Sequence, residues 1–200
     1  MFWIILSVFL WGIIHSLLAS SRAKDLARGR FGAMSTRFYR LFYNVFAVLS
    51  FVPVLGIAAL TADQTLYVVP FPWFGLMVLG ELLAIAGLVA GFLQTDAWEF
   101  LGLRQLAEND KTSQLKTSGL YHYVRHPLYL SGLLFIWLFP RMTVNLLAIN
   151  VAVTVYILIG TLFEERKLRR EFGEEYIEYC AATPMLIPFT KRNKSPHQLS

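Results

Sequence analysis

The run Trp73-Phe-Gly-Leu-Met-Val-Leu-Gly-Glu-Leu-Leu-Ala-Ile-Ala-Gly-Leu-Val-Ala-Gly-Phe-Leu93 decides the fold class, because Glu81 is its single charged residue. A helix of about 20 residues rises about 30 Å, which is the thickness of the hydrocarbon core of a bilayer. The run therefore predicts a transmembrane helix. A carboxylate far from both ends of a span is costly in lipid, so we expect Glu81 to face another helix.

Comparable apolar runs lie on both sides of this span, at Phe2 to Ala19, Leu41 to Leu60 and Leu128 to Phe163. Pro140-Arg-Met-Thr143 divides the last run into a helical hairpin. Its first arm is short, about 18 Å of helix, and its second arm is long enough to cross. Pro53 predicts a kink in the second span. The fold class is therefore all-α, a polytopic membrane protein with about five transmembrane helices.

Composition supports this class and excludes others. Hydrophobic residues make up 56% of the 200 residues, charged residues 16%, and the mean hydropathy is +0.52, whereas a soluble domain carries about 25% charged residues. Cys180 is the single cysteine and the chain has only four histidines, so no disulfide framework and no metal site is predicted. The net charge of +5 is read as loop charge of a membrane protein and not as a nucleic-acid surface.

The distribution of basic residues predicts the orientation. The segment between the first two spans holds six basic residues, the segment 96–125 four and the tail after Phe163 seven, whereas the loop between the second and third spans holds none. Basic loops lie on the cytoplasmic side, so we expect the N-terminus outside and the C-terminus in the cytoplasm. No basic residue precedes the apolar run that starts at Phe2, which favours a retained first span over a signal peptide.

The whole chain is predicted to form one integral membrane domain, 1–200. Residues 1–93 would be its three-span N-terminal part, 94–190 its cofactor-binding part and 191–200 a disordered tail. The two long polar segments, 94–126 and 164–200, share the cytoplasmic side in this topology. A cytoplasmic cleft for a soluble cofactor is therefore expected between them.

The densest cluster of chemically capable residues is Gly119-Leu-Tyr-His-Tyr-Val-Arg-His-Pro-Leu-Tyr129. Tyrosines at the entrance to a span are typical of an interfacial belt. Arg125 and His126 directly before Pro127 also resemble an anion or carboxylate site at a helix start. The residue types alone leave both interpretations open.

Three other features carry alternatives. Glu164-Glu165, at the end of the last span, is either a solvated helix end or a site, and the two carboxylates point about 100° apart. The stretch Leu101 to Lys116 is either an amphipathic helix on the membrane surface or a cleft wall. His15, inside the first span, is more often a hydrogen-bonded core histidine than a ligand.

The ordered set of motifs resembles a known family. Gly119-x-Tyr121-x-x-x-Arg125-His126-Pro127-x-Tyr129, then Glu164-Glu165, then Phe172-Gly-Glu-Glu-Tyr-x-x-Tyr179 and Pro184…Pro188-Phe189 resemble the isoprenylcysteine carboxyl methyltransferase family. Phospholipid N-methyltransferases share part of this pattern. The N-terminal half, with His15-Ser-Leu-Leu-Ala19 and Arg37-x-Tyr-Arg-Leu-x-Tyr-Asn44, is similar to NnrU-like proteins and to bacterial methanethiol S-methyltransferases.

The resemblance implies an S-adenosyl-L-methionine-dependent methyltransferase. The implied cofactor contacts are Gln105, Ser113, Gln114, Leu115, Lys116, Tyr121, His126, Pro127, Leu128, Tyr129 and Glu164. Glu164 would bind the ammonium of the cofactor, His126 with Arg125 would face its carboxylate, and Tyr121 with Tyr129 would lie near the sulfonium. Lys116 departs from the family, which has a hydrophobic residue there.

The acceptor is predicted from a second departure. Gly160 stands where the prenylcysteine enzymes have a basic residue near their substrate, so we expect a small or lipophilic thiol as methyl acceptor. A prenylcysteine carboxyl group or a phospholipid amine is the alternative. Arg125 and Glu165 are predicted to be catalytic, orienting the acceptor or removing its proton. Expected partners are this acceptor and membrane lipid, with no nucleic acid. The rival from another class is an NnrU-like haem-binding protein with His15 as axial ligand.

Overall fold

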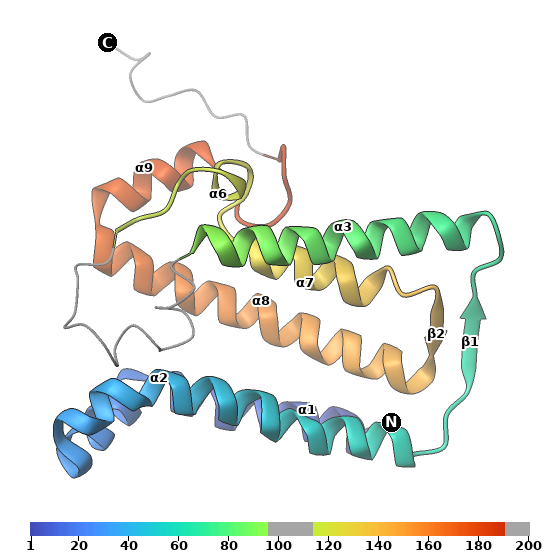
Figure 1. The fold of residues 1–200 in the computed structure, drawn as a ribbon, viewed down its shortest axis with the longest axis horizontal. Helices are drawn as coiled ribbons and strands as arrows, with labels where there is room; N and C mark the ends of the chain where they lie inside the picture. Colours follow the sequence, from blue (N-terminus) through green and yellow to red (C-terminus); the bar gives the residue numbers. More distant parts are fainter. Residues whose placement is uncertain (96–113, 191–200) are drawn as a thin grey trace. The chain divides into compact units, whose positions relative to one another are not determined.

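The computed structural model describes residues 1–95 and 114–190, and this part of the chain is almost entirely helical (Figure 1). The helices are α1 (Phe2–Ala19), α2 (Ser21–Leu60), α3 (Trp73–Gln94), α6 (Leu120–Tyr123), α7 (Pro127–Trp137), α8 (Val144–Phe172) and α9 (Glu174–Ala182). The two short strands are β1 (Thr65–Val68) and β2 (Arg141–Thr143). The all-α class predicted from hydropathy is confirmed.

Four helical segments are long and apolar enough to cross a membrane: Phe2–Ala19, Phe38–Leu60, Trp73–Gln94 and Val144–Phe172. Their large apolar side chains face outward, as Phe9, Leu49 and Leu83 do with more than half of their surface exposed. Lipid is the solvent that such faces require. The chain is therefore an integral membrane protein, as predicted.

Helix α7 is the short arm of the predicted hairpin. It has 11 residues, about 16 Å of helix, and residues 138–140 continue it without helical structure until the amide of Val69 donates to the carbonyl of Pro140 at 2.9 Å. An extended residue advances about twice as far as a helical one. The short arm therefore reaches the turn after β1 although it is less than a full span.

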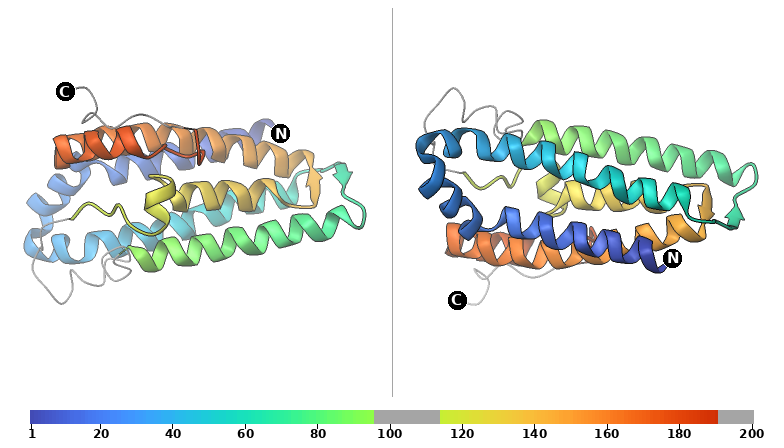
Figure 2. Two further views of the ribbon diagram at one scale, coloured as in Figure 1. Left: turned by 90° about the horizontal axis from the view of Figure 1, so that it is seen from above. Right: turned by 90° about the horizontal axis from the view of Figure 1, so that it is seen from below.

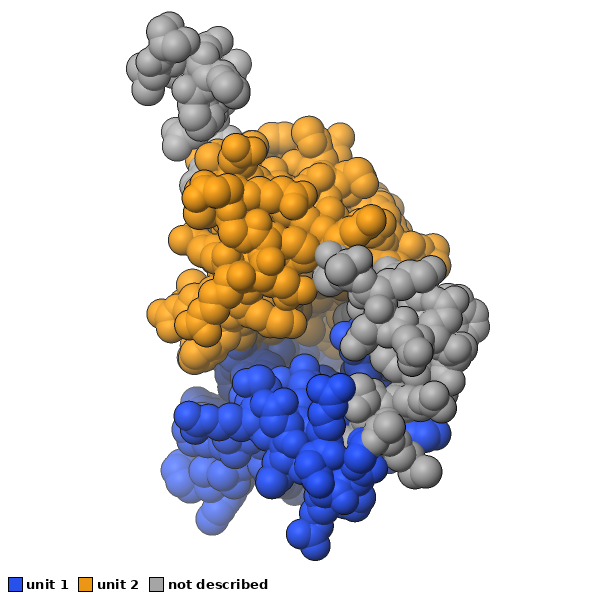
Figure 3. Space-filling model, turned by 90° about the vertical axis from the view of Figure 1, so that its left-hand side faces the viewer, with its two compact units in different colours: residues 1–68, 96–112, 141–156 blue, residues 69–95, 113–140, 157–200 orange. Residues whose placement is uncertain are grey.

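The described part of the chain divides into two compact units (Figure 3), one made of residues 1–68 and 141–156, the other of residues 69–95, 114–140 and 157–190. In the first unit α1 and α2 lie side by side and antiparallel (Figure 2). Gly12 permits the close approach of the N-terminal half of α8, because a Cβ at that position would lie 2.9 Å from the ring of Tyr156.

The middle of the first unit is held by a polar and aromatic cluster. The imidazole of His15 forms hydrogen bonds with the hydroxyl of Tyr156 (Nδ1, 2.6 Å) and with the hydroxyl of Tyr43 (Nε2, 2.7 Å). Trp11 stacks on the imidazole and donates its indole N–H to Ser50 at 3.1 Å. His15 therefore ties three helices together, which is the hydrogen-bonded role that its position predicted.

Asn145 joins the start of α8 to the end of α2 in the same unit. Its amide donates to the carbonyls of Ala58 (3.1 Å) and Thr61 (3.0 Å) at the end of α2, and its backbone N–H donates to Asp63 at 3.0 Å. These bonds satisfy carbonyl groups that a helix end leaves without partners. β1 and β2 pair antiparallel beside them, with Val68 opposite Arg141, a ladder too short for the sequence pattern to predict.

Helix α2 differs from the expectation in its start and in the position of its break. α2 begins at Ser21, twenty residues before the predicted second span, because the basic segment that precedes the membrane is helical too. Its backbone breaks at Gly32, where φ is 61°, and not at Pro53. Hydropathy identifies the part of a helix that crosses lipid, and it does not show that the helix continues into a polar segment.

In the second unit α7 packs along α3 (Figure 2), and glycines of α3 lie at the contact. A Cβ at Gly87 or Gly91 would lie 3.0 Å or less from a side-chain atom of α7, and one at Gly80 would lie 2.7 Å from the side chain of Leu138, directly after α7. The short side chains let the two helices approach closely, as small residues do in membrane helix pairs. This packing fixes the start of α7, and with it the candidate site.

Candidate functional site

The Arg-His-Pro segment is positioned by backbone contacts with the C-terminal part of the chain. The amide of Arg125 donates to the carbonyl of Pro184 at 2.9 Å, and the amide of His126 donates to the carbonyl of Met185 at 3.2 Å. Pro127 occupies the first turn of α7, where its missing N–H costs nothing. The predicted helix start at Pro127 is confirmed.

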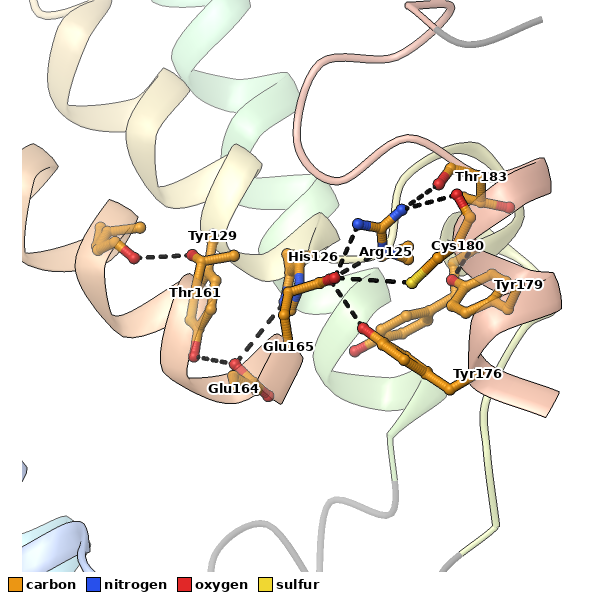
Figure 4. Close-up of polar contacts among 12 residues, drawn as sticks. Arg125, His126, Tyr129, Thr161, Glu164, Glu165, Tyr176, Tyr179, Cys180 and Thr183 are labelled. Carbon is orange, nitrogen blue, oxygen red and sulfur yellow. Dashed lines mark hydrogen bonds and ion pairs between the residues drawn. The ribbon is translucent and has the colours of Figure 1, made fainter. Parts of the chain in front are cut away.

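Glu165 is the centre of a buried network (Figure 4). Its carboxylate accepts two hydrogen bonds from Arg125, Nε to Oε1 and Nη2 to Oε2, both 2.9 Å. Oε1 also accepts the hydroxyl of Tyr176 at 2.8 Å and lies 2.8 Å from Nε2 of His126. A carboxylate paired with a guanidinium can only accept, so Nε2 of His126 carries its hydrogen. Arg125, His126 and Glu165 are each 6–7% exposed.

The remaining donors of Arg125 point to the end of α9. Nη1 donates to the carbonyls of Cys180 and Thr183, which are groups that the helix end leaves without intrahelical partners. Arg125 therefore connects α8, through Glu165, with the C-terminus of α9. We name this set of Arg125, Glu165, Tyr176, Cys180 and Thr183 the C-terminal clasp.

The α9 residues of the clasp also belong to an apolar cluster. Tyr176, Tyr179 and Cys180 form a buried cluster on α9, and Leu115, Leu168 and Phe172 pack against it. Burial raises the pKa of the Tyr176 phenol well above its usual range, and its bond to Glu165 adds to the shift. Burial likewise raises the pKa of the Cys180 thiol. Neither group is ionised near neutral pH, as a structural role requires.

Glu164 has a different environment from its neighbour. Its side chain is 40% exposed, its Oε2 accepts the hydroxyl of Tyr129 at 2.6 Å, and the same oxygen lies 3.7 Å from Nδ1 of His126. The rings of His126 and Tyr129 are parallel, with centroids 5.4 Å apart. Figure 4 shows Glu164 turned toward Tyr129 and Glu165 turned toward Arg125. The expectation that the adjacent carboxylates face different ways is confirmed.

Tyr121 lies at the edge of this group. Its backbone carbonyl accepts the hydroxyl of Tyr179 at 2.5 Å. Burial, with a smaller effect from the charge of Glu164, raises the pKa of Tyr121 to about 12. Its ring is only partly buried, so a neutral aromatic side chain is available beside the exposed carboxylate.

The structure brings most of the predicted site residues into the second unit. Leu128 packs on Gly91 of α3, and Gln114 and Lys116 are exposed in the segment that leads to α6. Gln105 and Ser113 lie outside the described residues. The contributions of Tyr176, Cys180 and Thr183 were not predicted as site contacts. The spacing Tyr176-x-x-Tyr179-Cys180 places three of the buried groups on one face of a helix, and this was the available signal.

Comparison with known proteins places the chain in a class. It is 34% identical over 180 residues to a methanethiol S-methyltransferase of Crocosphaera subtropica, covering 82% of this chain and 68% of that protein. It is 39% identical over 111 residues to one of Pseudomonas deceptionensis, covering 53% and 42%. A protein-S-isoprenylcysteine O-methyltransferase B of Arabidopsis thaliana is 30% identical over 123 residues, 58% of each chain.

These relatives and the helical fold define a membrane methyltransferase, as the motifs predicted. The chain belongs to the family described as "Protein of unknown function (DUF1295)", which matches residues 3–183. The aligned part spans about half or less of most of these methanethiol methyltransferases. No solved structure matches the chain.

Proposed function

We propose that this protein transfers a methyl group from S-adenosylmethionine to a small or lipophilic thiol. The observation that carries the proposal is the contrast between the two adjacent glutamates. Glu165 is buried and hydrogen-bonded within the clasp, whereas Glu164 is partly exposed beside the parallel rings of His126 and Tyr129. The buried ion pair of Arg125 and Glu165 holds this turn of α8 in place, and Glu164 is the adjacent residue on it. A partly exposed carboxylate on a rigid support is suited to bind a charged ligand.

The residues fit the methyl donor at its ammonium end. S-adenosylmethionine supplies an electrophilic methyl group on a cationic sulfur. Tyr129 donates a hydrogen bond to Oε2 of Glu164. Because a carboxylate can accept about four hydrogen bonds, this exposed one can also accept from an ammonium group. Tyr121 and Tyr129 offer aromatic faces for the sulfonium. The transfer itself needs mainly positioning and exclusion of water.

Arg125 and Glu165 receive a different role from the catalytic one that the sequence suggested. Arg125 directs its donors to Glu165 and to two carbonyls, and little of its side chain is exposed. We therefore do not assign it to the cofactor carboxylate or to the acceptor. We assign both residues to positioning: through Nε2, Glu165 fixes the ring of His126.

The acceptor class is supported by the relatives' names and by Gly160. Two of the relatives reported above act by name on methanethiol. Gly160 lies one turn before Glu164 on the same side of α8, and a Cβ there would meet nothing within 4 Å. A glycine supplies no cation at this position. A carboxylate acceptor would enter without a counter-charge, which is costly, whereas a thiol enters neutral.

The haem-binding rival has less support. Both ring nitrogens of His15 lie within hydrogen-bond distance of tyrosine hydroxyls. Axial ligation would require the imidazole to give up one of these bonds. The purified protein is therefore expected to be colourless, without a Soret band.

The topology belongs to the same proposal. We place the N-terminus outside and α9 in the cytoplasm, where the methyl donor is available, on the basis of the basic loops. The acceptor would then arrive from the lipid side of the site.

The test is methyl transfer in one membrane preparation. Labelled S-adenosylmethionine is supplied with a short-chain thiol, a prenylcysteine analogue or phosphatidylethanolamine. Methylation of the thiol, lost in Glu164→Gln, supports the proposal. Transfer to the prenylcysteine carboxyl group with none to any thiol would overturn the acceptor assignment, and no transfer to any of the three would overturn the proposed activity.

A further inference from the structure

The end of α8 has a second functional face, opposite the clasp. Arg166, Lys167 and Arg170 follow the exposed apolar residue Phe163 at helical spacing, within about 100° of the helix surface. Glu165 and Leu168 lie on the other side of the helix, where they pack against the clasp and the α9 cluster. The basic face is therefore turned away from the clasp.

This face lines a hollow with a volume of about 490 Å³. The lining residues are Phe163, Arg166, Lys167, Arg170 and Glu171. The guanidinium of Arg166 lies over the ring of Phe163, 5.7 Å from its centroid, and Lys167 lies 3.9 Å from Glu171. Within residues 1–95 and 114–190, no carboxylate lies at ion-pair distance from Arg166 or Arg170. The hollow thus combines one apolar wall with two guanidinium groups that form no ion pair with a described carboxylate.

The position of the basic face along α8 indicates which ligand it binds. The apolar part of α8 ends at Phe163, and the cations begin one turn later. The headgroups of a bilayer begin where its hydrocarbon core ends, so the cations lie at the depth of lipid phosphates. Arginine presents paired donors that match phosphate oxygens, and juxtamembrane basic residues attract anionic lipids.

We propose that the face formed by Phe163, Arg166, Lys167 and Arg170 binds the phosphate of an anionic membrane phospholipid. Phe163 contacts the upper part of an acyl chain, and Arg166 and Arg170 pair with the phosphate. The bound lipid anchors the helix that carries Glu164 and Glu165. The proposal is independent of the methyl acceptor.

The experiment measures lipid binding to the full chain in detergent by native mass spectrometry. The probes are dioctanoyl phosphatidylglycerol, dioctanoyl phosphatidylcholine and inorganic phosphate. The variants are Arg166→Gln and Arg170→Gln. Arg169→Gln is the matched control, because it removes the same charge from a residue that does not line the hollow and lies about 60° from Arg166 and about 100° from Arg170 around the helix. All three side chains are exposed, so none of the changes disturbs a packed interior.

Saturable binding of phosphatidylglycerol, stronger than that of phosphatidylcholine, is expected. Each of Arg166→Gln and Arg170→Gln should weaken it about fivefold, and Arg169→Gln less than twofold. An equal loss of phosphatidylglycerol binding in all three variants would show that binding depends only on the total charge, and this would overturn the proposed site. Equal binding of the two lipids would do the same. Displacement of phosphatidylglycerol by inorganic phosphate would show a soluble-anion site in place of a lipid site.

Discussion

Replacement of Glu165 by glutamine tests the clasp most directly. The change keeps the shape of the side chain but removes the charge that Arg125 faces at 2.9 Å through two of its nitrogens. One carboxylate oxygen becomes an NH2 group, which must face a donor of Arg125, His126 or Tyr176. The guanidinium is then buried without a counter-charge.

The expected loss of stability follows from this burial. Breaking a buried ion pair by removing one partner costs about 3–5 kcal/mol, and both partners here are 6–7% exposed. For a chain of 150–250 residues, about 1 kcal/mol lowers the melting temperature by about 2–4 °C. Glu165→Gln should therefore lower the melting temperature by about 6–20 °C.

The single cysteine provides the assay. Cys180 is 8% exposed, and its sulfur lies 3.7 Å from Glu165, so a fluorogenic maleimide reacts when this region opens. The raised pKa of the thiol keeps the thiolate scarce in the folded protein and suppresses the background. A temperature ramp with this reagent in detergent reads out the opening of the clasp itself.

Two matched variants make the result decisive. Glu178→Gln removes a carboxylate from the exposed side of α9 and should leave the melting temperature within about 2 °C, since such surface changes cost less than about 0.5 kcal/mol. Glu164→Gln should leave stability nearly unchanged but weaken S-adenosylmethionine by about 1.5–3 kcal/mol, the range for a charge-assisted hydrogen bond. A Glu165→Gln protein that melts like wild type would refute the clasp and return both glutamates to a solvated helix end.

Three further outcomes are expected. Gly87→Val, whose Cβ would meet Ser131 at 2.5 Å, should cost about 1–3 kcal/mol by overpacking the α3–α7 contact; Gly75→Val, in open space on the same helix, is its control in a thermal unfolding assay. Gly160→Arg should raise the ratio of prenylcysteine to thiol methylation by about tenfold, because it supplies the missing cation, and an unchanged ratio would remove Gly160 as the determinant. In a cysteine-free background, a cysteine at Gln64 should label from outside intact cells and one at Glu174 only after permeabilisation; the reverse would invert the topology.

Hydropathy was sufficient to predict the spans but not the lengths of their helices. The first and third spans were predicted to within one residue of α1 and α3, because each begins and ends at the limits of an apolar run. The second helix extends twenty residues beyond its apolar part. The β1–β2 pair was missed altogether, since three or four residues per strand carry no periodicity.

The residues of the candidate site could be predicted from the sequence, but the environment of each residue could not. Motif order brought Arg125, His126, Tyr129 and the two glutamates into one region, which the structure confirms. Which glutamate is buried depends on the rotation of α8 relative to α9. No local pattern encodes that rotation, because it is fixed by the packing of Leu168 and Phe172 against the α9 cluster.

His126 links the two glutamates and explains why a buried ion pair is kept at this place. Its Nε2 is held by Glu165, its Nδ1 faces Glu164 at 3.7 Å, and its ring is parallel to that of Tyr129. A buried ion pair is weak evidence for stability, since apolar side chains of the same volume often stabilise as well. Apolar replacements would fill the same space but would leave the imidazole free to rotate. The ion pair therefore fixes the ring that faces Glu164, and this orientation, more than stability, accounts for a charged pair at the start of α7.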